Sequence, residues 1–356
     1  MRLIASSLAV AMSFILVLFF SAVFEGESDQ MVAYLEKMDA DIWVMQKGVS
    51  NMHMVSSIVW DWKADKIAQI PGVQKLKAIL YLNGPVKIGG RDWFSYILGI
   101  KPEHHSAGPW AMAQGDAMPG AGEAVIPEVI SKLTGVKIGD EITMIDRPLR
   151  VVGLTKGTFS MASSVVFVSH HDLGDLLEGK DQYSYIMVNA EPGVSIANLI
   201  KKIKYEVDKV NVLTSDEFIS SDWQLAVQMG AEIIRMMTML GAVLAALIVA
   251  FTAYSLITRK RRELAIAKAL GFRNSQIYMA ALCQSIIITG LGFLLALFIS
   301  FTLLAWLPII IPQINLVIRL HQFIPLAVIS LPVAALASIS AVHTVARVDP
   351  MTVFHN

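Results

Sequence analysis

The sequence predicts a membrane protein with four transmembrane α-helices and a large extracytoplasmic α+β domain inserted between helices 1 and 2. Three observations support this fold class. The 356 residues are 55% hydrophobic and only 16% charged, whereas soluble domains carry charge at about a quarter of their positions. Four apolar runs reach the ~20 residues that a helix needs to cross a bilayer. The residues between the first and second runs, 25–232, have the composition of an ordinary soluble domain.

The four apolar runs give the expected spans. We place transmembrane helices over residues 3–24, 233–257, 277–306 and 323–345. Pro325 and Pro332 lie inside the last run, where neighbouring helices can satisfy the carbonyls that a proline frees. Residues 307–322 are also apolar, but Pro308 and Pro312 favour a short external loop over a fifth span.

The first run could instead be a cleaved signal peptide, because Arg2 gives it a short basic start. However, the run is long, and residues 20–25 offer no small-x-small cleavage pattern. We therefore expect an uncleaved anchor.

A cluster of basic residues between the second and third runs determines the topology. An Arg or Lys at the centre of a spanning helix costs roughly 2.5 to 3.5 kcal/mol, so segment 258–276 stays in the cytoplasm. Both termini, including tail 346–356, then lie in the cytoplasm of a multi-pass inner (plasma) membrane protein, and region 25–232 lies outside. The basic residues of the cluster are Arg259, Lys260, Arg261, Arg262, Lys268 and Arg273.

The outer region begins and ends with helical patterns. Met31, Tyr34, Leu35 and Met38 recur at helical spacing, which extends the first span outward as a stalk. A second helical pattern starts at Ser215 and leads into the second span. Between these stalks, short strands alternate with short helices, which predicts a mixed α+β domain. We expect residues 104–119, which contain glycine and proline, to form a loop.

Several motifs resemble ABC-transporter permeases of the FtsX, macrolide-exporter (MacB) and lipoprotein-release (LolC/LolE) type, a family associated with mechanotransmission. The strongest is RELAIAKALGFRNSQI at residues 262–277, followed by the C-terminal ARVDPMTV at 346–353. The outer motifs GEAVIP at 122–127 and LTGVKIGDEI at 133–142 are similar to the periplasmic core of the same family. DIWVMQKG at 41–48 resembles the DevC-like branch. Members commonly begin with an amphipathic cytoplasmic helix, whereas here only Met1 and Arg2 precede the first run. We therefore do not assign to this chain any contacts that the helix makes in other members.

The resemblance implies a non-catalytic permease subunit that works with a separate cytoplasmic ABC ATPase and a second permease copy, as a homodimer or heterodimer. A periplasmic membrane-fusion protein is a further partner that it allows. The chain has no G-x-x-x-x-G-K-[ST] sequence, so we expect no cofactor on this chain and place ATP and Mg²⁺ on the partner ATPase. The basic residues are concentrated in one segment, which gives no argument for nucleic-acid binding.

Segment 258–276 is the cytoplasmic surface that could receive the ATPase as a coupling helix. An apolar face is combined with polar residues, and Gly271 suits a left-handed helix C-cap. The alternative is that the basic cluster only obeys the positive-inside rule and contacts lipid phosphates. The predicted ATPase-coupling residues are Arg262, Glu263, Leu264, Ile266, Ala267, Leu270 and Gly271.

A substrate groove is a second candidate, because related haem-exporting permeases use a lateral groove between the first two spans. The candidate residues at the outer ends of these spans are Glu25, Met229, Glu232 and Met236. The alternative is a flexible apolar packing face with an interfacial ion pair.

Other candidate chemistry is weak. The pairs His104–His105 and His170–His171 lack the i, i+4 spacing of a helical metal site, so we expect solvated surface histidines. Cys283 lies in an apolar run and is expected to be buried. We assign the tryptophans of the outer region to its core, although one could line an apolar substrate surface; they are Trp43, Trp60, Trp62 and Trp93.

Two functions follow from the resemblance. In the first, the permease exports or extracts an amphiphile (a lipid, lipoprotein, haem or drug). In the second, the same movement activates an extracytoplasmic partner such as a cell-wall hydrolase without transport. The sequence does not name the substrate or the direction of transport.

Overall fold

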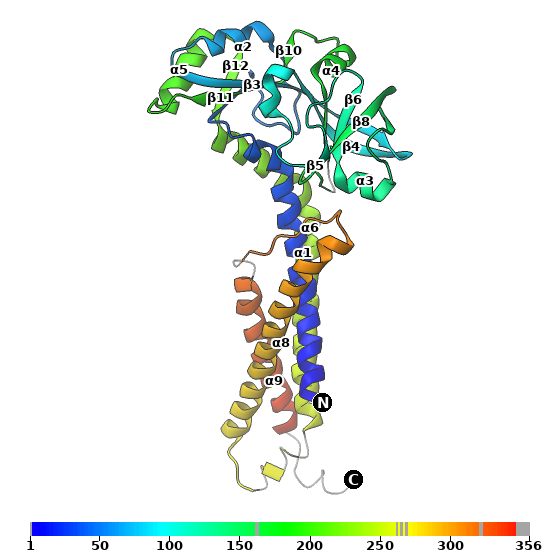
Figure 1. Ribbon diagram of the computed structural model, residues 1–356. Coiled ribbons are helices and arrows are strands. Elements are labelled where there is room, and N and C mark those ends of the chain that lie inside the picture. Colours follow the sequence, from blue (N-terminus) through cyan, green and yellow to red (C-terminus); the bar gives the residue numbers. More distant parts are fainter. Residues whose placement is uncertain are drawn as a thin grey trace. The chain divides into compact units, whose positions relative to one another are not determined.

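The computed structural model describes residues 2–160, 164–260, 263, 266–267, 270–319 and 323–346 (Figure 1). The chain divides into two compact units. Unit 1 contains Met1–Gly26, Ala231–Ile311 and Leu316–Asn356, and unit 2 contains Glu27–Gly230 and Pro312–Asn315. Two helices, α1 (Arg2–Lys37) and α6 (Ser215–Arg259), contribute residues to both units.

Unit 2 is built on a ten-stranded sheet of order β12-β1-β11-β3-β4-β9-β6-β8-β5, with β7 paired to β3 and β8. Most neighbours are antiparallel, but β4 pairs with β9 and β6 with β8 in parallel. A second sheet contains β10 and β2. The strands are β1 (Ile42–Gln46), β2 (Val59–Trp60), β3 (Val73–Ile88), β4 (Arg91–Ile100), β5 (Met112–Gly115), β6 (Glu123–Pro127), β7 (Glu141–Met144), β8 (Arg147–Thr155), β9 (Ser164–Ser169), β10 (Gln182–Tyr183), β11 (Tyr185–Ala190) and β12 (Val210–Thr214).

Short helices lie against this sheet in Figure 1. They are α2 (Asp61–Ala68), the 3₁₀ helix η1 (Pro102–Ala107), α3 (Glu128–Thr134), α4 (His170–Leu176) and α5 (Ile196–Glu206). Strand β1 contributes side chains to two hydrophobic cores, one on each face of the sheet. Ile42 and Val44 pack with α2 and α5, whereas Trp43 and Met45 point to the opposite face, because side chains alternate along a strand.

The second of these cores includes the outer ends of the two long helices. Tyr34 and Leu35 of α1, Met38 directly after it and Phe218 of α6 are buried in it beside Trp43. The helical spacing of residues 31–38 therefore gave the correct element and the correct buried face.

Strand β3 is continuous over its whole length, and different neighbours pair with its two halves: β11 with residues 73–79 and β4 with residues 80–88. The expected loop at 104–119 also contains η1 and β5. Strand β5 is short and lies at the edge of the sheet, where it pairs with β8. Its sequence therefore shows little of the alternation of apolar and polar residues that predicts a strand.

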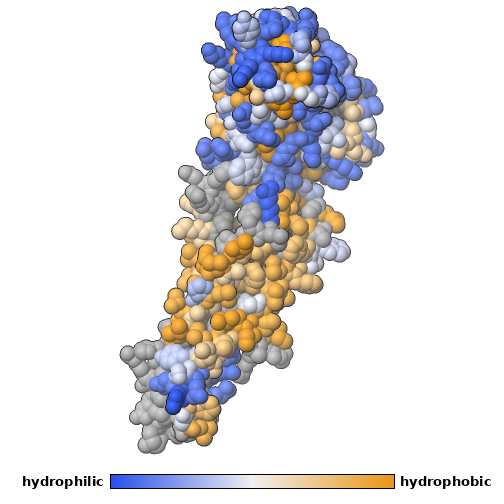
Figure 2. Space-filling model, turned by 90° about the vertical axis from the view of Figure 1, so that its left-hand side faces the viewer, coloured by the Kyte–Doolittle hydropathy of each residue, from blue (hydrophilic) through white to orange (hydrophobic). Residues whose placement is uncertain are grey.

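Unit 1 is a bundle formed by the inner parts of α1 and α6 with α8 (Asn274–Ile310) and α9 (Phe323–Ala346). Within the described residues, Ile4–Lys37 and Asn274–Leu304 are long and apolar enough to cross a membrane, whereas Met239–Thr252 and Ala327–Leu336 are shorter apolar segments. The count of four spans therefore stays a prediction. Figure 2 shows apolar residues covering the helices of unit 1 on the face in view.

The centre of the bundle is narrow and lined by α1. Val10, Phe14 and Leu18 are buried there, and the ring of Phe14 meets that of Phe293 edge-on at 5.7 Å. Gly292 of α8 lies so close to α1 that a Cβ atom at this position would be 2.7 Å from Val10 Cγ1. Small residues permit such close helix approach in membranes.

Candidate functional site

The predicted coupling segment is described at Glu263, Ile266, Ala267 and 270–273, and it is helical at the first three of these positions. Gly271 has φ 92°. The Phe272 N–H donates to the Ala267 carbonyl (3.2 Å), which is the bond that closes a helix at a left-handed C′ residue. The left-handed conformation predicted for Gly271 is confirmed. Arg262 and Leu264 lie outside the described residues.

The helix and its connector expose apolar side chains. Leu270 is 74% exposed, and Ile266 and Phe272 are also exposed. Glu263 is exposed beside them, with its carboxylate 3.8 Å from Lys260 Nζ. Exposed apolar residues next to a weakly paired carboxylate suit contact with another protein.

The next helix starts almost at once. The Arg273 N–H donates to the Gln276 Oε1 atom (2.9 Å), and α8 begins at Asn274. Among the described residues, Leu270, Gly271, Phe272 and Arg273 lie directly before α8, and Ala267 is the helical residue described before them.

Of the four residues of the predicted substrate groove, the structure describes the side chains of Glu25 and Met236. Glu25 is partly buried and its Oε2 atom lies 3.3 Å from Arg319 Nη1 in the loop before α9. Sequence reasoning assigned Glu25 no such partner, because nothing in the local pattern joins positions so far apart. Met236 is exposed, and the side chains of Met229 and Glu232 lie outside the described residues.

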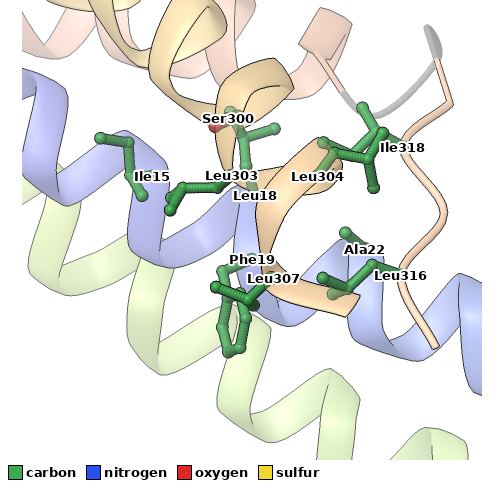
Figure 3. A pocket seen from close by; sticks show the side chains of 10 residues that line it. All are labelled: Ile15, Leu18, Phe19, Ala22, Ser300, Leu303, Leu304, Leu307, Leu316 and Ile318. Carbon is green, nitrogen blue, oxygen red and sulfur yellow. The ribbon is translucent and has the colours of Figure 1, made fainter. Parts of the chain in front are cut away.

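The loop between α8 and α9 also binds the outer part of α1 in unit 1. The Val317 N–H donates to the Ala22 carbonyl (3.0 Å). A small crevice of about 20 Å³ lies under this loop between α1 and α8 (Figure 3). Ser300 supplies a buried hydroxyl without a hydrogen-bond partner; the other lining residues are Ile15, Leu18, Phe19, Ala22, Leu303, Leu304, Leu307, Leu316 and Ile318. The crevice is too small for an amphiphile.

The expectation of solvated histidines is wrong for one member of each pair. His170 is buried and His104 is half-buried, and both rings pack on Tyr183, at 5.2 and 5.6 Å between centroids. Burial lowers the pKa of both imidazoles. His105 and His171 are exposed. The fold brings η1, α4 and β10 together. The position of the histidines as adjacent pairs in the sequence could not predict this contact.

Sequence reasoning missed a buried contact between Asp222, near the start of α6, and His53. Asp222 is fully buried, its Oδ2 atom lies 2.9 Å from His53 Nδ1, and its Oδ1 atom accepts the Met52 N–H (2.8 Å). The pair connects the irregular segment after β1 to the outer part of α6. An acidic residue in an amphipathic helix gives no signal of such burial.

Three other expectations fail. Trp60 and Trp62 are about half exposed, unlike the buried Trp43 and the half-buried Trp93. They flank the start of α2, and Trp62 lies beside the Lys63 ammonium (5.4 Å to the ring centroid). Cys283 is exposed rather than buried, since the outer faces of the bundle helices are themselves apolar.

Comparison with known proteins agrees with the motifs. Residues 3–205 match the family model described as MacB-like periplasmic core domain, and residues 235–348 match the model of the FtsX-like permease C-terminal. The chain is 22% identical, over 354 residues, to an uncharacterized ABC transporter permease of Mycobacterium tuberculosis (strain H37Rv), covering 99% of this chain and 95% of that protein. A second permease of the same strain is 22% identical over 365 residues, with the same coverage.

Solved structures include similar outer regions. The periplasmic region of MacB from Actinobacillus actinomycetemcomitans superposes with a TM-score of 0.41 and 12% identity, covering 54% of this chain and 96% of that one. The extracellular domain of the noncanonic ABC-type transporter YknZ from Gram-positive bacteria superposes with a TM-score of 0.39 and 14% identity. The match covers 49% of this chain and 100% of that one.

The fold and the motifs define a permease with membrane helices and a large domain of the periplasmic-core type. More specifically, the chain belongs to the family of ABC transporter permeases that combine a MacB-like periplasmic core domain with an FtsX-like C-terminal region.

Proposed function

We propose that this chain is the membrane subunit of an ABC transporter that receives work from a separate cytoplasmic ATPase through segment 258–276. The observation that carries the proposal is the capped helix ending at Gly271, which exposes Leu270 and Ile266 beside Glu263. The membership in a permease family supports an ABC ATPase as the partner.

The coupling residues have distinct roles in this proposal. Leu270, Ile266 and Ala267 enter an apolar recess of the ATPase, and Glu263, with Arg262, makes polar contacts around them. Leu264 completes the apolar face. Gly271 ends the helix, so force on it acts on the start of α8 rather than being absorbed by a flexible linker.

Two continuous helices support transmission to the outer domain. Helix α1 supplies Val10 and Phe14 to the core of unit 1 and Tyr34 and Leu35 to the core of unit 2. Helix α6 likewise supplies Ala245 to one core and Phe218 to the other. In the proposed cycle, two permease copies with four spans each move these helices as stalks when the ATPases close.

The proposed substrate is an amphiphile, exported or extracted at the outer leaflet. Unit 1 supports this class because its helices present extensive apolar surface (Figure 2). A lipid, lipoprotein, haem or drug would meet this requirement.

The test is the double variant Glu263→Ala with Leu270→Ala, assayed in the assembled complex with its ATPase. Loss of a buried leucine contact costs about 2 kcal/mol, so ATPase binding should weaken about 30-fold and transport should be lost, with membrane insertion unchanged. Leu247→Ala, at a similarly exposed leucine on α6, is the control and should behave as wild type. Normal transport and normal ATPase stimulation in the double variant would refute the proposal.

A further inference from the structure

A pocket of about 440 Å³ opens among α1, α6 and α8 at the end of unit 1 that carries the coupling segment. Its lining changes from small and apolar residues on α1 to polar and charged residues on α6. The lining residues are Ala5, Ser6 and Ala9 of α1; Phe251, Thr252, Ser255, Arg259, Lys260 and Glu263 of α6 and the residues that follow it; and Gln284 of α8.

The polar groups suit an anion. Three hydroxyls and one amide can donate hydrogen bonds, from Ser6, Thr252, Ser255 and Gln284. Arg259 and Lys260 supply two positive charges, and among the described residues Arg259 has no carboxylate within ion-pair distance, whereas Lys260 lies 3.8 Å from Glu263. The pocket therefore holds one more cation than its single carboxylate balances.

The apolar side of the pocket indicates where the anion comes from. Phe251 is 72% exposed two helical turns before Arg259, and Ala5 and Ala9 present no polar side chains. A free phosphate would use only the charged end, whereas a phospholipid would place its phosphate at Arg259 and its acyl chains along Phe251. Basic pockets between helices at the cytoplasmic surface are suited to anionic headgroups.

We propose that this pocket binds the headgroup of an anionic phospholipid from the cytoplasmic leaflet. The inference depends on the proposed topology, which places segment 258–276 at the cytoplasmic surface, but not on coupling to an ATPase. The phosphate lies between the Arg259 guanidinium and the Lys260 ammonium, with the Ser255 and Thr252 hydroxyls and the Gln284 amide donating to its oxygens.

The test is native mass spectrometry of the full chain, purified in a neutral detergent and titrated with phosphatidylglycerol. Each cation contributes about a fivefold change in affinity, so Arg259→Gln with Lys260→Gln should bind about 25-fold more weakly. Ser255→Leu fills the pocket without changing its charge and should weaken binding as strongly. Arg273→Gln removes a cation of the same segment outside the pocket and should have no effect.

Further outcomes would overturn the proposal. Two results would mean that the lipid is attracted only by the general positive charge. One is equal affinity of the wild type and Ser255→Leu for phosphatidylglycerol. The other is a loss of affinity in Arg273→Gln as large as that in the double variant. Tight binding of phosphatidylcholine would remove the requirement for an anionic headgroup. Displacement of the lipid by inorganic phosphate at comparable concentration would identify a free-phosphate site. The readout needs neither transport nor an ATPase, so its failure is distinguishable from failure of the coupling proposal.

Discussion

Units 1 and 2 are both rich in apolar side chains, but unit 2 buries its large apolar side chains whereas unit 1 exposes many of them. In unit 2 the large side chains of β1, β3 and β11 point inward to cores with 0% exposure, as at Trp43 and Tyr185. In unit 1 many of the largest side chains point outward, such as Leu247 at 60% and Phe251 at 72% exposure on α6. The difference indicates that water surrounds unit 2 and lipid surrounds unit 1.

The interiors differ in the same way. Unit 2 buries polar groups with partners, including Asp222 with His53 and Ser95 with Ser164 (2.7 Å between hydroxyls). Unit 1 relies on small residues, with Ala245 and Ala296 in its core and Gly292 against Val10. We therefore expect unit 2 to be most sensitive to the loss of a polar partner and unit 1 to the addition of volume.

The largest effect is expected from Asp222→Ala. The substitution leaves two buried polar groups, the Met52 N–H and the His53 ring, without the carboxylate that they face, and each such loss costs about 1 to 3 kcal/mol. Hydrogen–deuterium exchange of the full chain should show reduced protection in β1 and β11. Asp216→Ala is the matched control, since Asp216 is exposed on the first turn of the same helix and should cost at most about 1 kcal/mol. Equal protection in both variants would contradict the role of the buried pair.

Gly292→Val should have the next largest effect, in unit 1. Its added side chain meets Val10 and the Ser7 carbonyl of α1, and such overpacking costs about 1 to 3 kcal/mol. Gly290→Val is the control on the same helix, because a Cβ atom there meets nothing within 4 Å. Thermal unfolding in detergent should separate the two variants. Similar melting temperatures would show that α1 and α8 are not closely packed.

The smallest effect is a pH dependence confined to unit 2. Burial lowers the pKa of His104 and His170 below the ordinary value of 6.5. The unfolded chain therefore binds protons that the folded chain does not, so stability present above about pH 6.5 falls as the pH falls further. The protection factors of the β10 and α4 amides, which correct for the intrinsic pH dependence of exchange, should fall between pH 7.5 and 5.5, and His104→Gln with His170→Gln should flatten this response.

The exposed neighbour provides the control for the pH response. His105→Gln should retain the full pH dependence of the wild type, since its side chain is exposed. A flattened response in this variant, or an unchanged response in the double variant, would show that other groups control the pH dependence.

The two units also differ in how far the sequence predicted them. Long apolar runs predicted α9 nearly to the residue and α8 to within four residues at each end, and the helical spacing of residues 31–38 predicted the buried end of α1. The left-handed conformation of Gly271 was predictable, because a glycine after a helical run favours a left-handed cap. These features depend on local sequence.

Features that depend on distant contacts were not predictable. The packing of His104 and His170 on Tyr183, the burial of Asp222 and the pairing of Glu25 with Arg319 join positions far apart in the chain. The exposure of Cys283 was misjudged for another reason: an apolar run shows that a helix prefers lipid or a core, but not which face meets which.

The contrast between the units leads to one direct measurement of where the ATPase acts. A photo-reactive benzoylphenylalanine is introduced at Leu270 or at Phe94, which are both apolar and exposed, the first in unit 1 and the second in unit 2. Illumination of membranes that contain the assembled, active complex should crosslink the position-270 variant to the ABC ATPase and the position-94 variant to no ATPase. A crosslink from position 94, or none from position 270 in an active complex, would contradict the account.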